Sequence, residues 1–225
     1  FEIDVMVSDG THEVIARLKI SITDVIDAPT FSDPGSAVYG DLDFDENTDT
    51  SFTPRLVDTA DSTIKFSITG GDDQTKFSID PDAGTFQLIE LPDFEIPTDT
   101  GVNNTYLVEV SATANDTFTS SKIYTITINN TNDNAPVFTS GISTNINENS
   151  LSTGYIPAAT DADLDIVSYS LTGGADQAAF LLDSTSGELL LLSELDYETP
   201  TDSDSNNQYE IEISATDGTF ITTEN

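Results

Sequence analysis

Oxygen-bearing side chains are concentrated in the short segment Asn130-Thr131-Asn132-Asp133-Asn134, which is followed by Ala135-Pro136. Carboxylate, amide and carbonyl oxygens are the ligands of hard cations such as Ca²⁺, which takes roughly six to eight of them at about 2.3–2.6 Å. The segment is a poor strand and a poor helix, so we expect a linker that presents its oxygens outward. Such a linker could supply half of a calcium site and leave the rest to flanking domains. On these residues alone, a solvated turn of Asn and Asp is the alternative.

The charge balance of the chain also favours a cation and excludes other partners. The 225 residues carry 41 Asp and Glu against six Lys and Arg, a formal net charge of −35. Phosphates of nucleic acids and anionic membranes bind clustered cations, so we expect neither nucleic acid nor direct membrane contact. The segment 132–225 has 17 acids and no Lys or Arg, so its closest carboxylates need neutralisation from outside. A divalent cation would provide it, and so would concentrated salt around a halophilic protein.

The remaining composition indicates a folded fragment without disulfides. Hydrophobic residues make up 36% of the chain, and no apolar run reaches the roughly 18 residues of a membrane span. Cysteine is absent, which excludes a disulfide-stapled domain. The single histidine, His12, follows Gly10-Thr11 and is expected to face solvent in a turn. Because the chain begins at Phe1, we expect a piece of a longer protein.

Short strands are predicted along the whole chain. Apolar and polar residues alternate with period two in residues 1–7 and again in 14–22, which predicts a hairpin. The same alternation runs from Tyr106 to Ala112 and from Tyr209 to Ala215, whereas a sustained helical period of 3.6 is absent. About seven short strands in roughly 100 residues are typical of a β-sandwich, so the predicted fold class is all-β.

Internal repeats predict the domain organisation. Ser67-Ile68-Thr69-Gly70-Gly71 recurs 103 residues later as Ser170-Leu171-Thr172-Gly173-Gly174, and Asp93-Phe94-Glu95 recurs at the same spacing as Asp196-Tyr197-Glu198. Collinear matches at a fixed period indicate a tandem array. The predicted domains are residues 1–28, the C-terminal strands and linker of a truncated repeat; 29–131, a complete repeat; and 132–225, a repeat that lacks its last strand.

These motifs resemble the cadherin extracellular repeat. Three of them carry the resemblance: Asn132-Asp133-Asn134-Ala135-Pro136-Val137-Phe138, Leu195-Asp196-Tyr197-Glu198 and Asp161-Ala162-Asp163. The resemblance extends over the whole chain and implies tandem seven-stranded Greek-key β-sandwiches joined by calcium-binding linkers. The Pro200-Thr201-Asp202 extension is more similar to cadherin-type repeats of large bacterial surface proteins.

The resemblance implies three Ca²⁺ ions at each junction between consecutive repeats, with a ligand set of acids, amides and two backbone carbonyls. These ligands are Glu46, Asp93 and Glu95 at the base of the second repeat; the side chains of Asn130, Asn132 and Asp133 and the carbonyls of Thr131 and Asn134 in the linker; and Asp161, Asp163 and Asp217 at the top of the third repeat. The family usually has Asp where this chain has Asn130. We therefore expect a modestly lower affinity for the middle ion.

Candidate ligands recur at two further places. At the first junction, between the first and second repeats, they are Asp9, the counterpart of Asp217, with Asp24 and Asp27 ahead of the second repeat and Asp58 and Asp61 within it. Ile26 replaces Asn132 there and cannot ligate through its side chain, so the outermost ion should be weak or absent. At the base of the third repeat the candidates are Glu148, Asp196 and Glu198. Asp202-Ser203-Asp204-Ser205-Asn206 begins like a calcium loop but lacks its Gly and Glu, so we expect a solvated loop.

The predicted function is that of a non-enzymatic, calcium-dependent extracellular segment of a larger secreted or membrane-anchored protein. Ca²⁺ would join neighbouring repeats of the chain into a stiff rod, and the segment would mediate adhesion by binding the same protein on another cell. The alternatives are a passive spacer and a carbohydrate-binding module for surface glycans. Glycoside cleavage by an acid pair is the least favoured, because the resemblance already accounts for the acids at repeat junctions.

Overall fold

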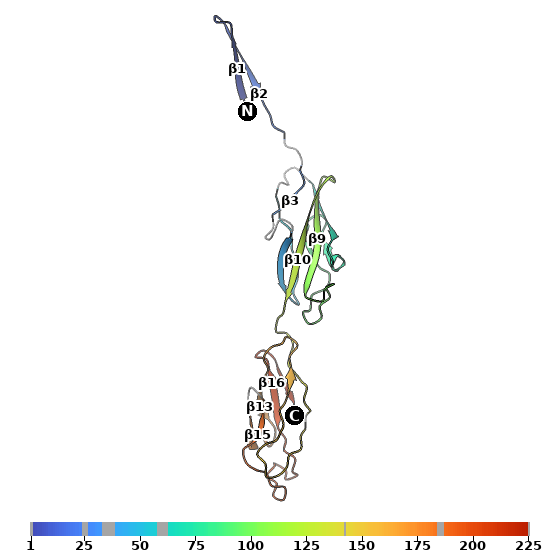
Figure 1. The fold of residues 1–225 in the computed structure, drawn as a ribbon, viewed down its shortest axis with the longest axis vertical. Helices are drawn as coiled ribbons and strands as arrows, with labels where there is room; N and C mark the ends of the chain where they lie inside the picture. The colour runs from blue at the N-terminus through green and yellow to red at the C-terminus, as the bar shows by residue number, and fades with distance from the viewer. Residues whose placement is uncertain are drawn as a thin grey trace. The chain divides into compact units, whose positions relative to one another are not determined.

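The computed structural model describes residues 2–23, 27–32, 39–57, 63–141, 143–183 and 187–224 (Figure 1). These residues form short strands and two single-turn 3₁₀ helices, η1 (Gln74–Lys76) and η2 (Gln177–Ala179), which confirms the all-β class. Neither helix in this part of the chain is long enough to cross a membrane. The chain divides into two compact units: unit 1 comprises 1–44, 48–91 and 98–127, and unit 2 comprises 45–47, 92–97 and 128–225.

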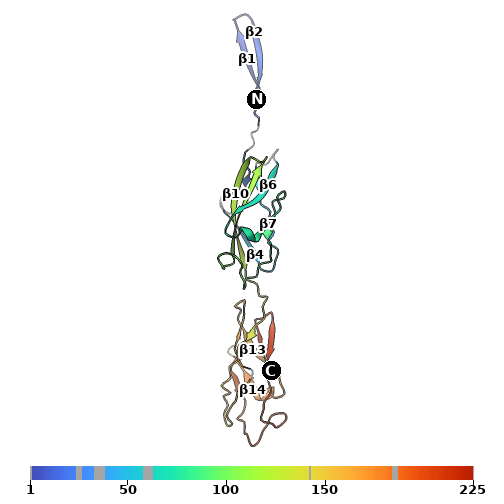
Figure 2. The same cartoon turned by 90° about the vertical axis from the view of Figure 1, so that its right-hand side faces the viewer.

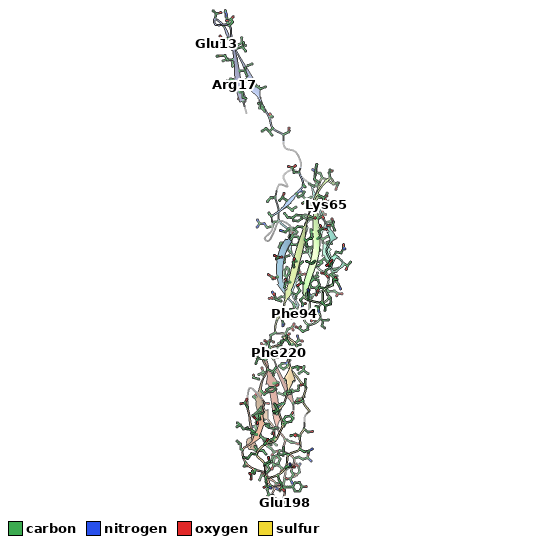
Figure 3. All side chains as sticks on the ribbon, viewed as in Figure 1. Glu13, Arg17, Lys65, Phe94, Glu198 and Phe220 are labelled. Carbon is green, nitrogen blue, oxygen red and sulfur yellow. The ribbon has the colours of Figure 1, made fainter. Side chains whose placement is uncertain are left out.

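The N-terminal residues form a two-stranded ribbon (Figures 1 and 2). Strand β1 (Glu2–Ser8) pairs antiparallel with β2 (Glu13–Lys19), as the alternating pattern predicts. The register pairs Val7 with Val14, and each of them is 68% exposed. Paired residues lie on the same face of an antiparallel ladder, so one face of the ribbon is an exposed apolar row. On the other face Arg17 Nε donates to Asp4 Oδ1 at 2.8 Å (Arg17 is labelled in Figure 3).

Unit 1 is built on a four-stranded sheet in the order β4-β10-β9-β6. The strands are β4 (Tyr39–Asp45), β6 (Ile64–Gly70), β9 (Thr105–Ala114) and β10 (Phe118–Asn129). Two short pairs accompany the sheet, β3 (Thr30–Phe31) with β5 (Leu56–Val57) and β7 (Phe77–Ile79) with β8 (Phe86–Leu88). Figure 2 shows β7 beside the strands of the sheet.

The core of unit 1 consists of alternate residues of β9 and β10. Tyr106, Val108 and Val110 are at most 1% exposed, which confirms the alternation predicted from Tyr106 to Ala112, and Tyr124 of β10 is equally buried. Aromatic rings of the short strands pack on them: Phe86 lies 5.0 Å from Tyr124 between ring centroids. Burial of a large apolar side chain stabilises a fold by about 1.5–3 kcal/mol, so these contacts hold the two layers of the sandwich together.

Unit 2 repeats this arrangement with shorter strands. Its three-stranded sheet has the order β13 (Ser168–Gly173), β16 (Glu212–Thr216) and β17 (Ile221–Glu224). The short pairs are β11 (Val137–Phe138) with β12 (Ala159–Thr160) and β14 (Phe180–Leu182) with β15 (Leu189–Leu191). The sequence predicts a repeat without its last strand, whereas β17 pairs with β16 over four residues. The predicted domain boundaries themselves stay a prediction.

Equivalent buried aspartates fix equivalent loops in the two units. Asp73 accepts hydrogen bonds from the backbone N–H groups of Thr100 and Leu107, at 2.6 and 2.9 Å. Asp176 stands 103 residues later and accepts from Ser203 and Glu210 at 2.7 and 2.9 Å. Buried backbone donors need a partner, so these carboxylates have a structural role in each unit.

A second pair of aspartates closes the loop that follows. Asp99 accepts from the backbone of Asn103 and Asn104, and Asp202 accepts from Asn206 and Asn207 at 2.6 and 3.3 Å. Asp202 is only 6% exposed. The prediction of a solvated loop is therefore wrong for Asp202, because the backbone N–H groups of the loop turn inward to its carboxylate.

Candidate cation-binding site

Four carboxylates of unit 2 converge on the segment 130–134. Glu46, Glu95, Asp133 and Asp163 each place one oxygen within 4.8 Å of the others. Glu46 directly follows β4, and Asp163 lies in the loop that follows β12. Both Glu46 and Asp163 are buried. Like charges about 4 Å apart repel by roughly 4 kcal/mol at an effective dielectric near 20, so this arrangement is costly without a positive charge.

Backbone donors hold Glu46 in place. Its Oε2 accepts from the N–H of Phe94 at 2.7 Å, and its Oε1 accepts from the N–H of Thr131 at 2.8 Å (Phe94 is labelled in Figure 3). The hydroxyl of Thr131 also donates to Oε1, at 3.3 Å. One buried carboxylate therefore connects the turn around Phe94 with the linker.

Asp163 holds the other side of the linker. Its Oδ2 accepts from the N–H groups of Asp133 and Asn134 at 3.0 and 2.8 Å. The side-chain amide of Asn130 donates to the backbone carbonyl of Asp163 at 3.0 Å. Burial acts to raise the pKa of Asp163, but hydrogen bonds from the side chain and backbone of Asn134 and from the backbone of Asp133 keep it below its ordinary value.

The side-chain amide of Asn134 lies among three of the acids. Its Nδ2 donates to Asp133 Oδ1 at 2.7 Å, to Asp163 Oδ1 at 2.9 Å and to Glu95 Oε2 at 3.2 Å. The amide of Asn47 donates to the other oxygen of Asp133. These amides are neutral, so they satisfy hydrogen bonds but leave the negative charge of the cluster in place.

Two members of the cluster show the electrostatic cost. Burial raises the pKa of Glu95, and the charges of Glu46, Asp163 and Asp133 raise it further. Burial and the charge of Glu46 likewise raise the pKa of Asp133. Glu95 Oε1 is buried and has no hydrogen-bond partner among the described residues. A nearby cation would relieve both the repulsion and this unpaired oxygen.

The remaining ligands predicted for this site lie beside the cluster. Asp93 Oδ1 accepts from the N–H of Ile96 at 3.0 Å. Burial opposes ionisation of Asp217, but the backbone N–H groups of Phe220 and Thr219 and the side chain of Asn132 lower its pKa (Phe220 is labelled in Figure 3). Asp217 Oδ2 and Asn132 Oδ1 are buried without a hydrogen-bond partner in the described part of the chain.

The structure adds one residue that the sequence did not single out. Asp161, Asp163 and Asp165 form a second group in which the three acids each place an oxygen within 4.8 Å of the others. Asp161 and Asp163 belong to the predicted set, whereas Asp165 does not. The alternate spacing of the three acids is the signal that would have identified it.

At the base of the third repeat a third group is formed by Glu148, Asp196 and Glu198. Each of them also places one oxygen within 4.8 Å of the others. All three are exposed, and Glu198 is labelled in Figure 3. Glu148 Oε2 accepts from the N–H of Tyr197 at 3.0 Å, as Glu46 does from Phe94. The two bases, which the sequence predicts to be equivalent, therefore each contain the same hydrogen bond from an aromatic residue's backbone to a glutamate.

The candidates at the first junction, between the first and second repeats, are only partly described. Asp24, Asp58 and Asp61 lie outside the described residues. Asp27 is exposed. Asp9 accepts from the N–H groups of Thr11 and His12 at 2.8 and 2.7 Å, and these bonds lower its pKa. As ligands, all five stay predictions.

No family model matches the chain. Human protocadherin Fat 4 is 31% identical over 211 residues, covering 87% of the chain and 4% of that protein. Human protocadherin Fat 1 is 31% identical over 148 residues, 62% of the chain and 3% of that protein. The Drosophila melanogaster protein dachsous is 30% identical over 226 residues, 94% of the chain and 6% of that protein. The chain thus spans a small fraction of the length of these curated relatives.

Solved structures share the fold at lower identity. Human protocadherin-24 EC1-2 aligns with a TM-score of 0.63 and 21% identity, covering 88% of the chain and 92% of that structure. Mouse cadherin-23 EC22-24 aligns with a TM-score of 0.62 and 22% identity, covering 96% of the chain and 69% of that structure. The likeness supports the sandwich architecture. These relatives are animal proteins, and the narrower resemblance to bacterial surface proteins stays a prediction.

Proposed function

Since the chain consists of cadherin-like repeats, and is an extracellular, non-enzymatic, adhesion-type segment of a larger protein, we propose that it binds Ca²⁺ around residues 130–134. One observation carries the proposal: four carboxylates place oxygens within 4.8 Å of one another. Hard divalent cations take oxygen ligands, and several carboxylates around one centre are the arrangement that Ca²⁺ accepts.

The residues present fit such an ion. Glu46, Glu95, Asp133 and Asp163 would hold it, and Glu95 Oε1 is a buried oxygen that still needs a partner. The side-chain amide of Asn134 donates to three of the four acids, so positive charge is favourable between these carboxylates. Bound calcium would supply that charge. Asp163 also belongs to the second group, so Asp161 and Asp163 could hold a further ion beside the first.

Stiffening of the chain would follow from the origin of the ligands. Glu46 and Glu95 come from the base of the second repeat, Asp133 from the linker and Asp163 from the top of the third repeat. An ion held by all of them restricts the linker, whereas repulsion among free carboxylates favours separation. At hundredfold excess over Kd, each site adds about 2.7 kcal/mol to the free energy of unfolding, so three sites approach about 8 kcal/mol.

The binding step is tested by calorimetric titration of Ca²⁺ into the chelator-treated 225-residue chain. Wild type should bind Ca²⁺ and show a calcium-dependent rise in Tm, and Asp133→Asn should lose most of both effects. Asn retains the shape of the side chain but removes its charge. Absence of calcium binding by the wild type would contradict the proposal.

Stiffening and adhesion are tested separately. Scattering profiles of the chain with Ca²⁺ and with chelator should differ, and superimposable profiles would argue against stiffening. We propose homophilic adhesion as the role of the stiffened segment, in line with its adhesion-type relatives. Beads coated with the chain should then aggregate with Ca²⁺ and disperse with chelator. Dispersed beads in both conditions, with calcium binding intact, would favour a passive spacer.

A further inference from the structure

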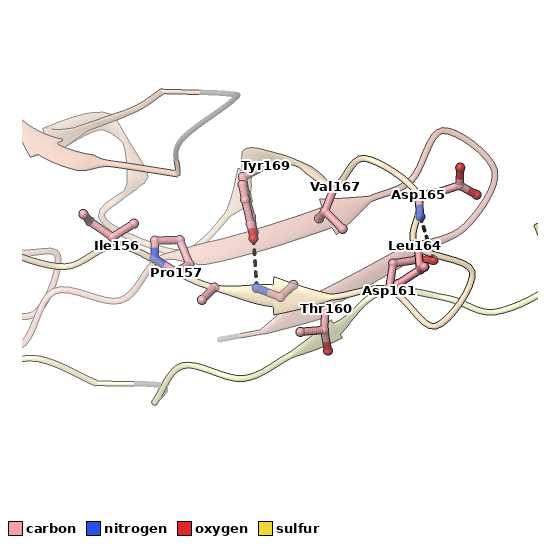
Figure 4. A pocket seen from close by; sticks show the side chains of 10 residues that line it. Ile156, Pro157, Thr160, Asp161, Leu164, Asp165, Val167 and Tyr169 are labelled. Carbon is pink, nitrogen blue, oxygen red and sulfur yellow. Dashed lines mark hydrogen bonds between the residues drawn. The ribbon is translucent and has the colours of Figure 1, made fainter. Parts of the chain in front are cut away.

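The loop between β12 and β13 holds an acid that the cadherin-like motif does not require. Asp161, Asp163 and Asp165 each place an oxygen within 4.8 Å of the other two. Figure 4 shows Asp161, Leu164 and Asp165 at one end of an open hollow that Ile156 and Tyr169 also line. Asp163 is shared with the four-carboxylate cluster, whereas Asp165 belongs to this loop alone.

Asp161 supplies an independent sign of a missing partner. The residue is 9% exposed, and its Oδ2 is buried without a hydrogen-bond partner among the described residues. Its other oxygen, Oδ1, accepts from the N–H groups of Asp163 and Asp165 at 3.0 and 3.4 Å (the second bond is drawn in Figure 4). A buried carboxylate oxygen is unfavourable unless a donor or a cation pairs with it, so Oδ2 indicates a ligand.

The backbone brings Asp165 back toward Asp161. The N–H of Leu164 donates to the carbonyl of Asp161 at 3.4 Å, which closes a tight turn. Leu164 has a φ of 65°, in the left-handed region that residues with a Cβ rarely adopt, and its side chain is exposed. The turn therefore leaves the carboxylate of Asp165 next to those of Asp161 and Asp163.

We propose that Asp165 is a direct ligand of a calcium ion held by Asp161 and Asp163, so that this loop contributes three carboxylates instead of two. The inference rests on the calcium binding proposed above and adds a ligand to it. Affinity for Ca²⁺ rises with the number of charged ligands around the ion, so the third carboxylate tightens this position. Ser62 occupies the equivalent place 103 residues earlier, so the second repeat lacks this ligand.

The test compares wild type with Asp165→Asn, Asp165→Glu and two reference variants of the 225-residue chain. Asp204→Asn is the matched control, since it removes one exposed carboxylate from a different loop of the same repeat. Asp133→Asn reports on the main cluster. Calcium binding is measured by calorimetric titration, and backbone chemical shifts of residues 161–167 locate the affected ion.

Asp165→Asn should lower the affinity for one of the bound ions by about tenfold or more. Loss of a group that only supports a metal ligand lowers metal affinity by about 10–100-fold, and loss of a direct ligand should lower it at least as much. The calcium-induced changes in the chemical shifts of residues 161–167 should then reach saturation at a correspondingly higher Ca²⁺ concentration. Asp165→Glu should restore most of the affinity, and Asp204→Asn should bind as wild type does. The Tm of Asp165→Asn in chelator should not fall, because removing one of three crowded charges relieves repulsion.

Three results would overturn the inference. If Asp165→Asn binds as wild type does while Asp133→Asn loses binding, Asp165 is no ligand and the proposed function stands. If Asp204→Asn weakens binding as much as Asp165→Asn does, the effect is one of net charge and not of ligation. If the wild-type chain binds no Ca²⁺, the inference falls together with the proposed function.

Discussion

The bases of the second and third repeats carry the same acids in different surroundings. Glu46 and Glu148 each accept a hydrogen bond from the backbone of an aromatic residue, Phe94 at 2.7 Å and Tyr197 at 3.0 Å. Glu46 is nevertheless 2% exposed, whereas Glu148 is exposed. The same local turn therefore forms in both places, but only one of the two glutamates is enclosed.

The linker accounts for the difference. Glu46 also accepts from Thr131, and Asp133 and Asp163 lie against it. Glu148 instead lies with Asp196 and Glu198 in a group whose three members are all exposed. The three acids at each base, and the turn around Phe94 or Tyr197, are therefore determined by the sequence of that base alone. Burial, raised pKa values and a closed set of oxygens come from the linker and the loop after β12.

The largest expected effect separates the two bases directly. Glu46→Gln should remove most of the calcium-induced stabilisation, which approaches about 8 kcal/mol if three sites are filled at hundredfold excess. Glu148→Gln makes the same chemical change at the equivalent position and should leave that stabilisation intact. Chemical denaturation with Ca²⁺ and with chelator measures both. Equal losses in the two variants would mean that enclosure by the linker does not matter.

A smaller effect is expected from the amide inside the enclosed cluster. Asn134→Ala removes the donor shared by Glu95, Asp133 and Asp163. In chelator the variant should lose about 1–3 kcal/mol of stability, since hydrogen bonds to charged groups are lost. Saturating Ca²⁺ should recover most of that loss. Urea denaturation under both conditions tests this, and a loss that calcium does not reduce would argue against a cation among these acids.

The pH dependence of stability should also distinguish the enclosed cluster. Glu95 and Asp133 have pKa values above their ordinary 4.5 and 3.8, so the folded chain binds these protons more tightly than the unfolded chain. Their contribution in chelator should therefore rise as the pH falls from 7 through the raised pKa values, and level off below the ordinary ones. Asp163, whose pKa is lowered, should lose its contribution below about its ordinary 3.8.

Thermal denaturation between pH 7 and pH 4 in chelator measures this dependence. The quantity compared is the difference in Tm between wild type and a Glu95→Gln, Asp133→Asn double variant. The difference should narrow as the pH falls, because protonation neutralises the same two groups in the wild type. A difference that is constant over the whole range would contradict the raised pKa values.

The smallest effect is expected away from both bases. Asp204→Ala removes an exposed acid whose carboxylate accepts from the side chain of Asn206 at 2.7 Å. Stability should change by no more than about 0.5 kcal/mol, as for other surface substitutions, and the calcium-induced rise in Tm should be unchanged. A reduced calcium response would show that loss of one exposed charge is enough to affect calcium binding.

Much of the fold was predictable because strands and repeats leave periodic signals. The alternation from Tyr106 to Ala112 predicted the buried face of β9, and the 103-residue period carried the prediction into unit 2. The loops were less predictable. The sequence predicts a solvated loop at Asp202, but inward-turned backbone N–H groups bury it, as they do Asp99. The direction of those N–H groups leaves no alternation of apolar and polar residues to detect.

The acids of the candidate site were predictable, but their hydrogen bonds were not. The sequence and the cadherin resemblance named all four members of the cluster, yet assigned Thr131 and Asn134 only through their carbonyls. In the structure the N–H of Thr131 donates to Glu46, and the side chain of Asn134 donates to three acids. Sequence motifs give residue types and spacing, whereas the direction of an amide depends on neighbours brought together by folding.

The bonds of Asp163 have a mechanical consequence. Its carboxylate holds the linker through the N–H of Asp133 and through both the backbone and the side chain of Asn134. Because these bonds all end on one carboxylate, the linker separates from Asp163 only when every one of them is broken. The ribbon of β1 and β2 is the opposite case, because Glu2 pairs with Lys19 at its open end. Pulled at these residues it unzips one pair at a time, and we expect it to yield at a lower force.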